Sequence, residues 1–465
     1  MCPKERSVVG WPFSVRRGKL FERPRFFHAL LLIAAVLPCP TAAEDTKGSA
    51  GDRDALLLKR IEMLEQRLYE VERELATRGT SSCQASVPAP AADADSSSGS
   101  GKRSAASVLR PEGVTANAYL EGHYGYNFNQ PVGRANLLRA YDATSNNFTL
   151  SQAALVLERA PDVEAGRRAG GRLDLQFGQA TETLQGSELN EPRPRIYQNI
   201  FQAYGSYVFP VGSGLRVDFG KFASALGYEG NYAKDQINYS RSYWFNFLPF
   251  YHTGFRTTYN LGDNATIANW VVNGANQAED FNGFKSTAFL LTLTPTKTFS
   301  WNLNYYTGRE QREILRGLNG RTRVPEGRMQ VFDSYASWNL SDKLLLVGEA
   351  DYVTNAVSGE GPLGSASGGA AYARYQFTPE FSLGGRFAYL RDSDGVFSGT
   401  NQVLRDSTLT AAYNLAEGIQ AKLEYRRDVS NRPFFLRDTA GDLKKEQNTV
   451  TLGLMWWFGG KQGSW

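Results

Sequence analysis

The stretch Thr449-Val-Thr-Leu-Gly-Leu-Met-Trp-Trp-Phe458 decides the fold, because its side chains divide into two faces with a period of two. One face carries Val450, Leu452, Leu454, Trp456 and Phe458. The preceding segment repeats the pattern: its apolar set is Ile419, Ala421, Leu423 and Tyr425, and its polar set is Gln420, Lys422, Glu424 and Arg426. Strict alternation over such a length is typical of β-strands that have different surroundings on their two faces.

Stretches of this kind recur from residue 114 to the C-terminus. The predicted strands are 115–127, 147–159, 169–179, 199–209, 214–223, 251–261, 264–274, 284–294, 297–307, 328–340, 343–354, 367–377, 380–391, 404–415, 418–428 and 447–458. A β-propeller would show a repeat for each blade, and the sequence has no such repeat. Long connections alternate with short ones along the whole series, and the long ones are 128–146, 180–198, 224–250, 275–283, 308–327, 355–366, 392–403 and 429–446.

This alternation of connection lengths is typical of a membrane barrel with tight turns at one rim and long loops at the other. We therefore predict an all-β fold, a transmembrane antiparallel up-and-down β-barrel of about 16 strands, over residues 114–465. An even number of strands places both ends of the barrel on the periplasmic side.

Residues 1–43 are predicted to be a secretory signal peptide. Basic residues precede the apolar run Ala29-Leu-Leu-Leu-Ile-Ala-Ala-Val-Leu37, and small residues follow up to Ala43, where we expect cleavage. The run is too short to cross a bilayer, which needs ~20 residues. Residues 1–43 hold seven of the 51 basic but only two of the 47 acidic residues. The remaining chain is therefore nearly neutral and gives no reason to expect a nucleic-acid partner.

Residues 54–78 carry a short heptad pattern, and residues 79–113 are rich in Ser, Ala, Gly and Pro. The apolar seam of the heptads is Leu57, Ile61, Leu64, Leu68, Val71 and Leu75. Spacings of four and three with charged residues between them predict a periplasmic coiled coil that associates with other copies of the chain. A lone amphipathic helix packed on a domain is the alternative. The composition of residues 79–113 predicts a flexible linker.

Residues that carry chemistry are scarce. With 3 Cys and 3 His, the chain has too few ligands for a disulfide scaffold or a Cys/His zinc cluster. Only His123 and His252 remain after processing, and neither lies beside a Ser or Asp motif of a hydrolase. We find no phosphate-binding glycine loop and no metal-ligand spacing. We therefore expect no enzyme, and no catalytic, cofactor-binding or metal-binding residues.

Charged side chains gather on the polar faces of the predicted strands, which a barrel turns toward its lumen. The basic ones are Arg172, Arg216, Arg256, Arg374, Arg386, Lys422 and Arg426, and the acidic ones are Asp174, Asp218, Asp333, Glu349, Asp351 and Glu424. Most of these are expected to be ordinary solvated charges. Because the two signs are mixed, the wall alone predicts no strong preference for cations or anions.

Several short motifs between residues 150 and 306 resemble the β-barrel porin-2 (OmpL-like) family of outer-membrane proteins. They are Leu150-Ser-Gln-Ala153, Gly171-Arg-Leu-Asp174, Asp218-Phe-Gly-Lys-Phe222, Leu226-Gly-Tyr-Glu229, Tyr239-Ser-Arg-Ser242, Tyr251-His-Thr-Gly254 and Val272-Asn-Gly274. The resemblance lies in their order and spacing. It implies a pore-forming barrel and does not name the solute, and the coiled coil lies outside the similar stretch.

Residues 224–250 form the longest connection and the third long one. General porins fold their third outside loop inward, so the resemblance implies that this loop narrows the channel. Candidate constriction and pore residues are Glu229, Lys234, Asp235, Arg241, Arg216, Asp218, Arg256, Arg386, Glu424 and Arg426. The loop also holds eight aromatic residues, which are able to stack on sugar rings. Packing of this loop on the barrel rim or at a subunit interface is the alternative.

The predicted function is an outer-membrane porin, a passive diffusion channel for small hydrophilic solutes. Its expected partners are the outer-membrane bilayer and further copies of the chain, with a trimer favoured. Two alternatives remain open: a structural or adhesive barrel tethered toward the cell wall through the coiled coil, and a substrate-specific, sugar-type channel.

Overall fold

The computed structural model describes residues 113–185, 191, 193–316, 321–323, 327–356 and 364–461. These residues belong to the second of two compact units, Gly101–Trp465. The predicted signal peptide and coiled coil, and all but the last residue of the predicted linker, lie outside the described residues. In the described part, no helix is both long enough and apolar enough to cross a membrane.

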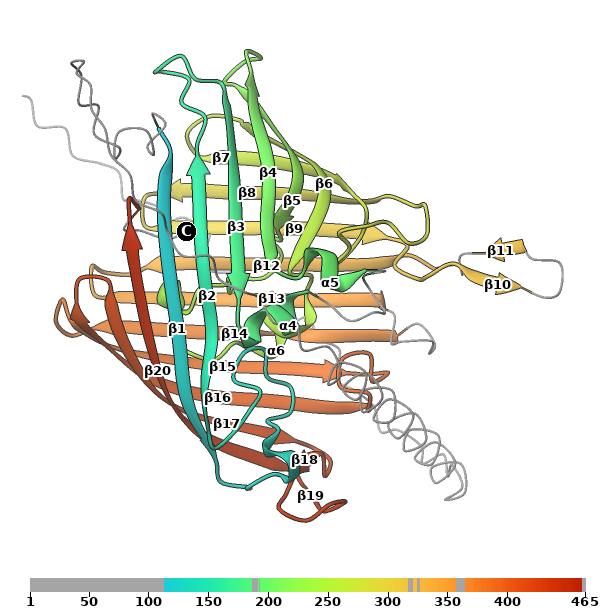
Figure 1. The fold of residues 1–465 in the computed structure, drawn as a ribbon, viewed down its shortest axis with the longest axis vertical. Coiled ribbons are helices and arrows are strands. Elements are labelled where there is room, and N and C mark those ends of the chain that lie inside the picture. Colours follow the sequence, from blue (N-terminus) through green and yellow to red (C-terminus); the bar gives the residue numbers. More distant parts are fainter. Residues whose placement is uncertain are drawn as a thin grey trace, which may run out of the picture. The chain divides into compact units, whose positions relative to one another are not determined.

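Sixteen strands of the described residues close into one antiparallel barrel, each paired with its neighbours in sequence, and β20 pairs with β1 to complete the ring (Figure 1). The strands are β1 (Thr115–Asn127), β2 (Asn147–Arg159), β3 (Ala169–Phe177), β4 (Ile200–Phe209), β5 (Leu215–Ala223), β6 (Tyr251–Asn260), β7 (Ala265–Val272), β8 (Ser286–Thr296), β9 (Phe299–Gly308), β12 (Met329–Asn339), β13 (Leu344–Ala356), β14 (Gly364–Gln376), β15 (Phe381–Asp392), β16 (Gln402–Ala416), β17 (Ile419–Ser430) and β20 (Glu446–Gly459). The predicted all-β up-and-down barrel and its strand number are confirmed.

Short elements outside the barrel sheet lie in the long connections. Two small hairpins are β10 (Ile314–Arg316) with β11 (Arg321–Arg323), and β18 (Phe435–Leu436) with β19 (Leu443–Lys444). The helices are η1 (Val132–Arg134), α4 (Gln179–Leu184), α5 (Pro194–Tyr197), η2 (Ala233–Asp235) and α6 (Tyr243–Phe247). None of these helices was predicted, because each is too short for a 3.6-residue period to repeat.

Strand ends differ from the prediction by up to three residues. β14 begins at Gly364 rather than at 367, and β3 ends at Phe177 rather than at 179. The early end of β3 has a backbone cause: Gly178 has a φ of 104°, a conformation that favours glycine. A Cβ there would lie 2.7 Å from the Ser151 carbonyl oxygen, so the chain leaves the sheet at Gly178 and begins α4.

The alternation predicted for the strands appears as alternating burial. On β17, Leu423 is 54% exposed, whereas its neighbours Lys422 and Glu424 are buried. Apolar side chains therefore face outward and polar ones face the lumen, as in a barrel whose outer surface meets lipid. The apolar core of the molecule lies inside the ring, where it forms between the inner wall and the loop that follows β5.

Candidate functional site

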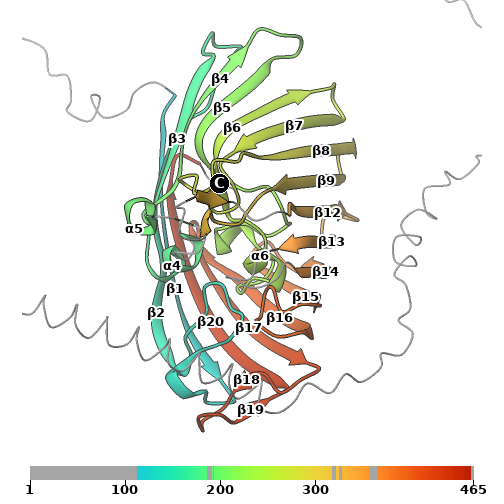
Figure 2. The same cartoon turned by 90° about the vertical axis from the view of Figure 1, so that its right-hand side faces the viewer.

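The inner loop, residues 224–250 between β5 and β6, folds into the barrel. Figure 2 shows α6, which belongs to this loop, inside the ring of strands. Ser242 caps α6 by accepting a hydrogen bond from the Phe245 amide, as expected of an N-cap serine. Trp244 is fully buried, and its indole Nε1 donates to the Tyr389 carbonyl oxygen on β15 at 3.0 Å.

Apolar side chains hold this part of the loop against the inner wall. Trp244 and Leu248 pack in one cluster with residues of many strands, namely Trp270, Ala288, Tyr306, Val331, Val353, Ala366, Leu390 and Leu404. Burying an aromatic ring of this size is a large favourable contribution. The inner loop is therefore a packed part of the barrel interior.

Charged groups of β17 bind the backbone of the inner loop. The Glu424 carboxylate accepts hydrogen bonds from the amides of Tyr239 at 2.6 Å and Ser240 at 3.1 Å. The Lys422 Nζ donates to the Ala233 carbonyl oxygen at 2.7 Å. Both side chains are buried, and hydrogen bonds to ionised groups are about twice as strong as neutral ones. These two residues satisfy loop backbone groups that are buried inside the barrel.

Arg386 on β15 joins the loop to two strands. Its guanidinium forms ion pairs with Glu229 of the loop at 3.0 Å and with Asp406 of β16 at 3.0 Å. It also donates to the Ser240 carbonyl oxygen at 2.6 Å. All three charged side chains are at most 3% exposed. Removal of one member of such a buried set leaves an uncompensated charge, which is costly.

A second buried set lies beside it. Arg426 of β17 pairs with Asp428 at 2.7 Å and donates to the Arg241 carbonyl oxygen at 2.6 Å. Asp428 also pairs with Arg139 of the 128–146 connection at 2.6 Å. Arg139 in turn pairs with Asp142 of the same connection. The two long connections are thus tied to the same strand through one carboxylate.

The predicted constriction charges of the loop are engaged with other groups. Arg241 is 1% exposed and donates to the carbonyl oxygens of Gly230 at 2.9 Å, Tyr239 at 2.6 Å and Asn231 at 2.8 Å. These bonds close the loop on itself. Lys234 and Asp235 pair with each other at 2.9 Å.

The structure brings five of the predicted candidates together under the loop, namely Glu229, Arg241, Arg386, Glu424 and Arg426. Their part in selectivity stays a prediction.

The other three candidates lie on a different part of the inner wall. Arg216 and Arg256 both bind the buried carboxylate of Asp218, at 2.8 Å and 2.7 Å. The Arg256 guanidinium lies between two rings, 4.6 Å from the centroid of Phe222 and 5.2 Å from that of Tyr204. The side chains of Arg216 and Arg256 are 37% and 19% exposed. These two guanidinium groups are held in place and still accessible.

Sequence reasoning missed four charged members of the buried sets, Asp406, Asp428, Arg139 and Asp142. Asp406 and Asp428 alternate with outward-facing residues on β16 and β17, so the period of two could have placed them on the lumen face. Arg139 lies in an irregular connection, where no periodicity assigns a side chain to a face. Its contact with Asp428 spans 289 positions in sequence and only the folded chain shows it.

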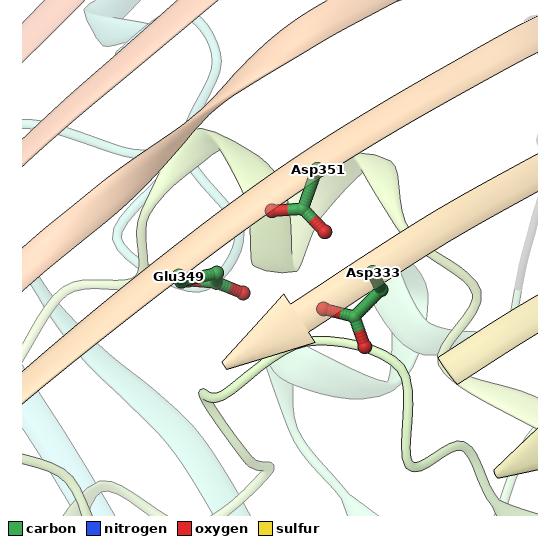
Figure 3. A group of neighbouring side chains, drawn as sticks. All are labelled: Asp333, Glu349 and Asp351. Carbon is green, nitrogen blue, oxygen red and sulfur yellow. The ribbon is translucent and has the colours of Figure 1, made fainter. Parts of the chain in front are cut away.

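Three carboxylates converge at another point of the inner wall. Asp333 of β12 and Glu349 and Asp351 of β13 point toward one another (Figure 3), and one carboxylate oxygen from each lies within 4.8 Å of the other two. The sequence had placed all three on the lumen face, as charges of a wet channel. The structure instead buries all three.

The two histidines of the barrel are both buried. His123 Nδ1 lies 2.7 Å from the Ser151 hydroxyl oxygen, and His252 Nε2 lies 3.2 Å from the Ser224 hydroxyl oxygen. Both imidazoles are at most 4% exposed. The Ser–His contacts are therefore closed off from solvent, and they join residues 28 positions apart that no local motif could reveal.

The family model described as "Putative beta-barrel porin-2, OmpL-like" matches residues 113–458. The chain belongs to this family. The resemblance seen in the short sequence motifs is thus confirmed over the whole barrel. The protein is an outer-membrane porin, and the family makes it a passive channel. No curated protein matches the chain.

Solved porin-type barrels share the fold of this porin. The outer-membrane channel DcaP of Acinetobacter baumannii superposes with a TM-score of 0.50 at 13% identity, over 74% of this chain and 97% of that one. OprB of Pseudomonas putida gives 0.50 at 12% identity, over 75% and 94%. At these identities the similarity concerns the fold.

Proposed function

We propose that the porin conducts small hydrophilic solutes along the wall of β5 and β6, past Arg216 and Arg256, beside the inner loop. The exposed fractions of the candidate residues support this path. Arg216 and Arg256, at 37% and 19%, are the two most exposed of the ten. The five candidates under the inner loop are buried and bound to one another or to loop backbone. Accessible charge is what a passing solute encounters.

The charge of this wall favours a weak preference for anions. On β5 and β6, Arg216 and Arg256 share the single carboxylate of Asp218, so one positive charge is in excess. A fixed charge in a narrow aqueous passage raises the local concentration of counter-ions. The preference is expected to weaken as salt rises, because the Debye length falls from ~10 Å at 0.1 M to ~3 Å at 1 M.

Thiol modification in planar bilayers tests the path. Arg216→Cys is prepared in a chain whose remaining mature cysteine, Cys83, is changed to Ser. A negatively charged thiol reagent places a negative charge where the wild type has the positive charge of Arg216. We expect it to lower the conductance of anions. Leu409→Cys is the matched control, because Leu409 lies on a strand but is 58% exposed on the outer face.

A wild-type protein that forms no steady pore would contradict the channel and favour the structural, adhesive alternative. If thiol modification changed the conductance of the two cysteine variants equally, the protein would still be a channel. The solute path would then not follow β5 and β6. Conductance that saturates with one sugar would favour the substrate-specific alternative instead.

The heptads of residues 54–78 support the further proposal that copies of the porin associate, as a trimer, through a periplasmic coil. Deletion of residues 54–78 is expected to lower the stability of the oligomer in cross-linking experiments. The unit conductance is expected to stay the same, because residues 79–113 separate this segment from the barrel in sequence and have a composition typical of flexible linkers. A lost pore would show that the segment belongs to the channel.

We also propose that the porin has no catalytic activity. Its Ser–His contacts are buried, so a substrate has no access to the serine oxygen. A nucleophile must reach its substrate before an adjacent base is of use. Hydrolysis of ester or peptide substrates by the refolded protein, lost in Ser151→Ala, would contradict this.

A further inference from the structure

Three acidic side chains meet on neighbouring strands beneath the start of the inner loop. Asp333 of β12 lies directly opposite Asp351 of β13 in the register, and Glu349 lies two residues before Asp351 on the same face. Figure 3 shows the three carboxylates turned toward one another. Among the residues that the structure describes, no other group of three or more acidic, histidine or cysteine side chains is close enough to share a metal ion. Like charges placed opposite each other destabilise a sheet.

Part of the cluster binds the inner loop. Asp333 Oδ2 accepts a hydrogen bond from the Gly227 amide at 2.9 Å, and Glu349 Oε1 accepts one from the Tyr228 amide at 2.9 Å. The Tyr372 hydroxyl donates to Glu349 Oε2 at 3.1 Å. The first residues of the inner loop are therefore attached to β12 and β13 through these carboxylates.

The remaining oxygens have no such partner. Asp351 is 5% exposed, and neither of its carboxylate oxygens has a hydrogen-bond partner outside the three acidic residues. Asp333 Oδ1 is also buried without one. Within the described ranges, no basic side chain forms an ion pair with any of the three residues. Buried ionised carboxylates are stable only when paired or bound to a metal, so three oxygens here lack the positive charge that they require.

We propose that Asp333, Glu349 and Asp351 bind a divalent cation of the Ca²⁺ type. Ca²⁺ binds carboxylate oxygens at ~2.3–2.6 Å in flexible geometry, so oxygens on one ion lie up to about 5 Å apart. The observed limit of 4.8 Å meets this condition without any movement of the strands. Each of the three residues supplies one oxygen, and water completes the shell. Oxygen donors alone favour a hard cation over a transition metal.

The position of the site gives the ion a structural task. Its two positive charges offset two of the three negative charges at the point where the inner loop leaves β5 and meets β12 and β13. The loop arm at Gly227 and Tyr228 then stays attached to the wall. The site does not depend on which solute the channel conducts, so binding of the ion and conduction are measured separately.

Terbium luminescence measures the binding directly, with the mature, refolded porin in detergent. Tb³⁺ has the size and the oxygen preference of Ca²⁺, and tyrosine sensitises its emission at short range. Tyr372 touches Glu349, and Tyr335 lies opposite Glu349 in the register. We expect saturable binding of one Tb³⁺, displaced by Ca²⁺. Asp351→Asn is expected to weaken it at least tenfold. Asp342→Asn, in the exposed turn of the same hairpin, is the control and should bind as the wild type does.

Absent or non-saturable binding in the wild type would overturn the proposal, as would equal binding by Asp351→Asn. The first result would mean that the two aspartates hold a proton between them, and the second that the ion binds elsewhere. A second measurement decides if Asp351→Asn fails to fold. The temperature at which the wild-type barrel unfolds in SDS is then followed against Ca²⁺ concentration. Specific binding to the folded state raises this temperature, and no rise above that produced by equal ionic strength of Na⁺ overturns the site.

Discussion

Two regions of the inner wall use the same residue types in opposite ways. On β15–β17, arginines and carboxylates lie under the inner loop, and their side chains are almost fully buried. On β5 and β6, Arg216 and Arg256 share the carboxylate of Asp218 and stay accessible. Both regions belong to the polar, inward-turned faces of strands along which polar and apolar side chains alternate. The loop makes the difference, because it covers the first region and leaves the second free.

The difference shows that a charge on the lumen face need not take part in permeation. Under the loop, the charged groups replace the hydration that the loop backbone loses, as Glu424 does for the amides of Tyr239 and Ser240. On β5 and β6 the guanidinium groups still face water. Substitutions in the covered region should therefore change stability, and substitutions in the uncovered region should change selectivity.

The largest effect is expected from Arg386→Leu. This change leaves Glu229 and Asp406 buried without their cation, and breaking a buried ion pair from one side costs ~3–5 kcal/mol. The barrel should therefore lose its resistance to SDS at a much lower temperature, as followed by the difference in migration between heated and unheated samples.

The matched control for Arg386→Leu is Arg427→Gln on the next strand but one. Arg427 pairs with Glu446 at 2.7 Å, but both side chains are about half exposed, and exposed pairs contribute little. Similar losses in the two variants would show that burial under the loop does not set the strength of these pairs.

A somewhat smaller effect is expected on the outer face of the covered strands. Leu423→Arg on β17 turns a cation toward lipid, where it costs ~2–4 kcal/mol near the midplane. Its neighbour Lys422 is buried on the inner face, so one step along the chain changes the surroundings of the charge. Assembly into membranes should fall sharply for Leu423→Arg.

Gln420→Arg is the control for this change, since Gln420 is partly exposed and lies on the inner face. Thr451 is a less suitable control, because it lies opposite Glu424 and is buried. Assembly of Leu423→Arg as efficient as that of Gln420→Arg would reverse the assignment of the two faces.

The sequence alone was sufficient for the barrel wall but not for what lies inside it. Alternation along 419–426 and 449–458 assigned each side chain to a face, because a strand's period of two depends only on local geometry. It could not distinguish Arg386 from Arg256, since both lie on lumen faces. Their difference depends on where residues 224–250 pack, and such contacts have no period in the sequence.

The acidic cluster shows the same limit. The sequence places Asp333, Glu349 and Asp351 on one face, but the register that sets Asp333 opposite Asp351 follows from the pairing of β12 with β13. A shift of one position would separate the two. The burial that leaves Asp351 without partners depends on the folded interior.

A moderate effect on selectivity, together with a loss of stability because the Asp218 carboxylate is buried, is expected from Arg216→Gln combined with Arg256→Gln. The pair of changes leaves Asp218 as a net negative charge on the accessible wall. A unit charge acts with about 1 kcal/mol at 4 Å in water, so the ratio of cation to anion permeability should rise several-fold. Reversal potentials in a salt gradient measure this ratio. An unchanged ratio at 0.1 M salt would mean that ions do not pass this wall.

The smallest change of selectivity is expected from Arg241→Gln, although it also removes one positive charge inside the barrel. Arg241 is 1% exposed, and its guanidinium is held by three carbonyl oxygens of the inner loop. Its field acts on buried groups rather than on the passing ion. Reversal potentials should therefore stay close to those of the wild type, while the loop loses three charge-assisted hydrogen bonds and the single-channel current becomes noisier. A shift as large as that of the Arg216 and Arg256 variant would place Arg241 at the constriction, and the covered and uncovered regions would then both border the permeation path.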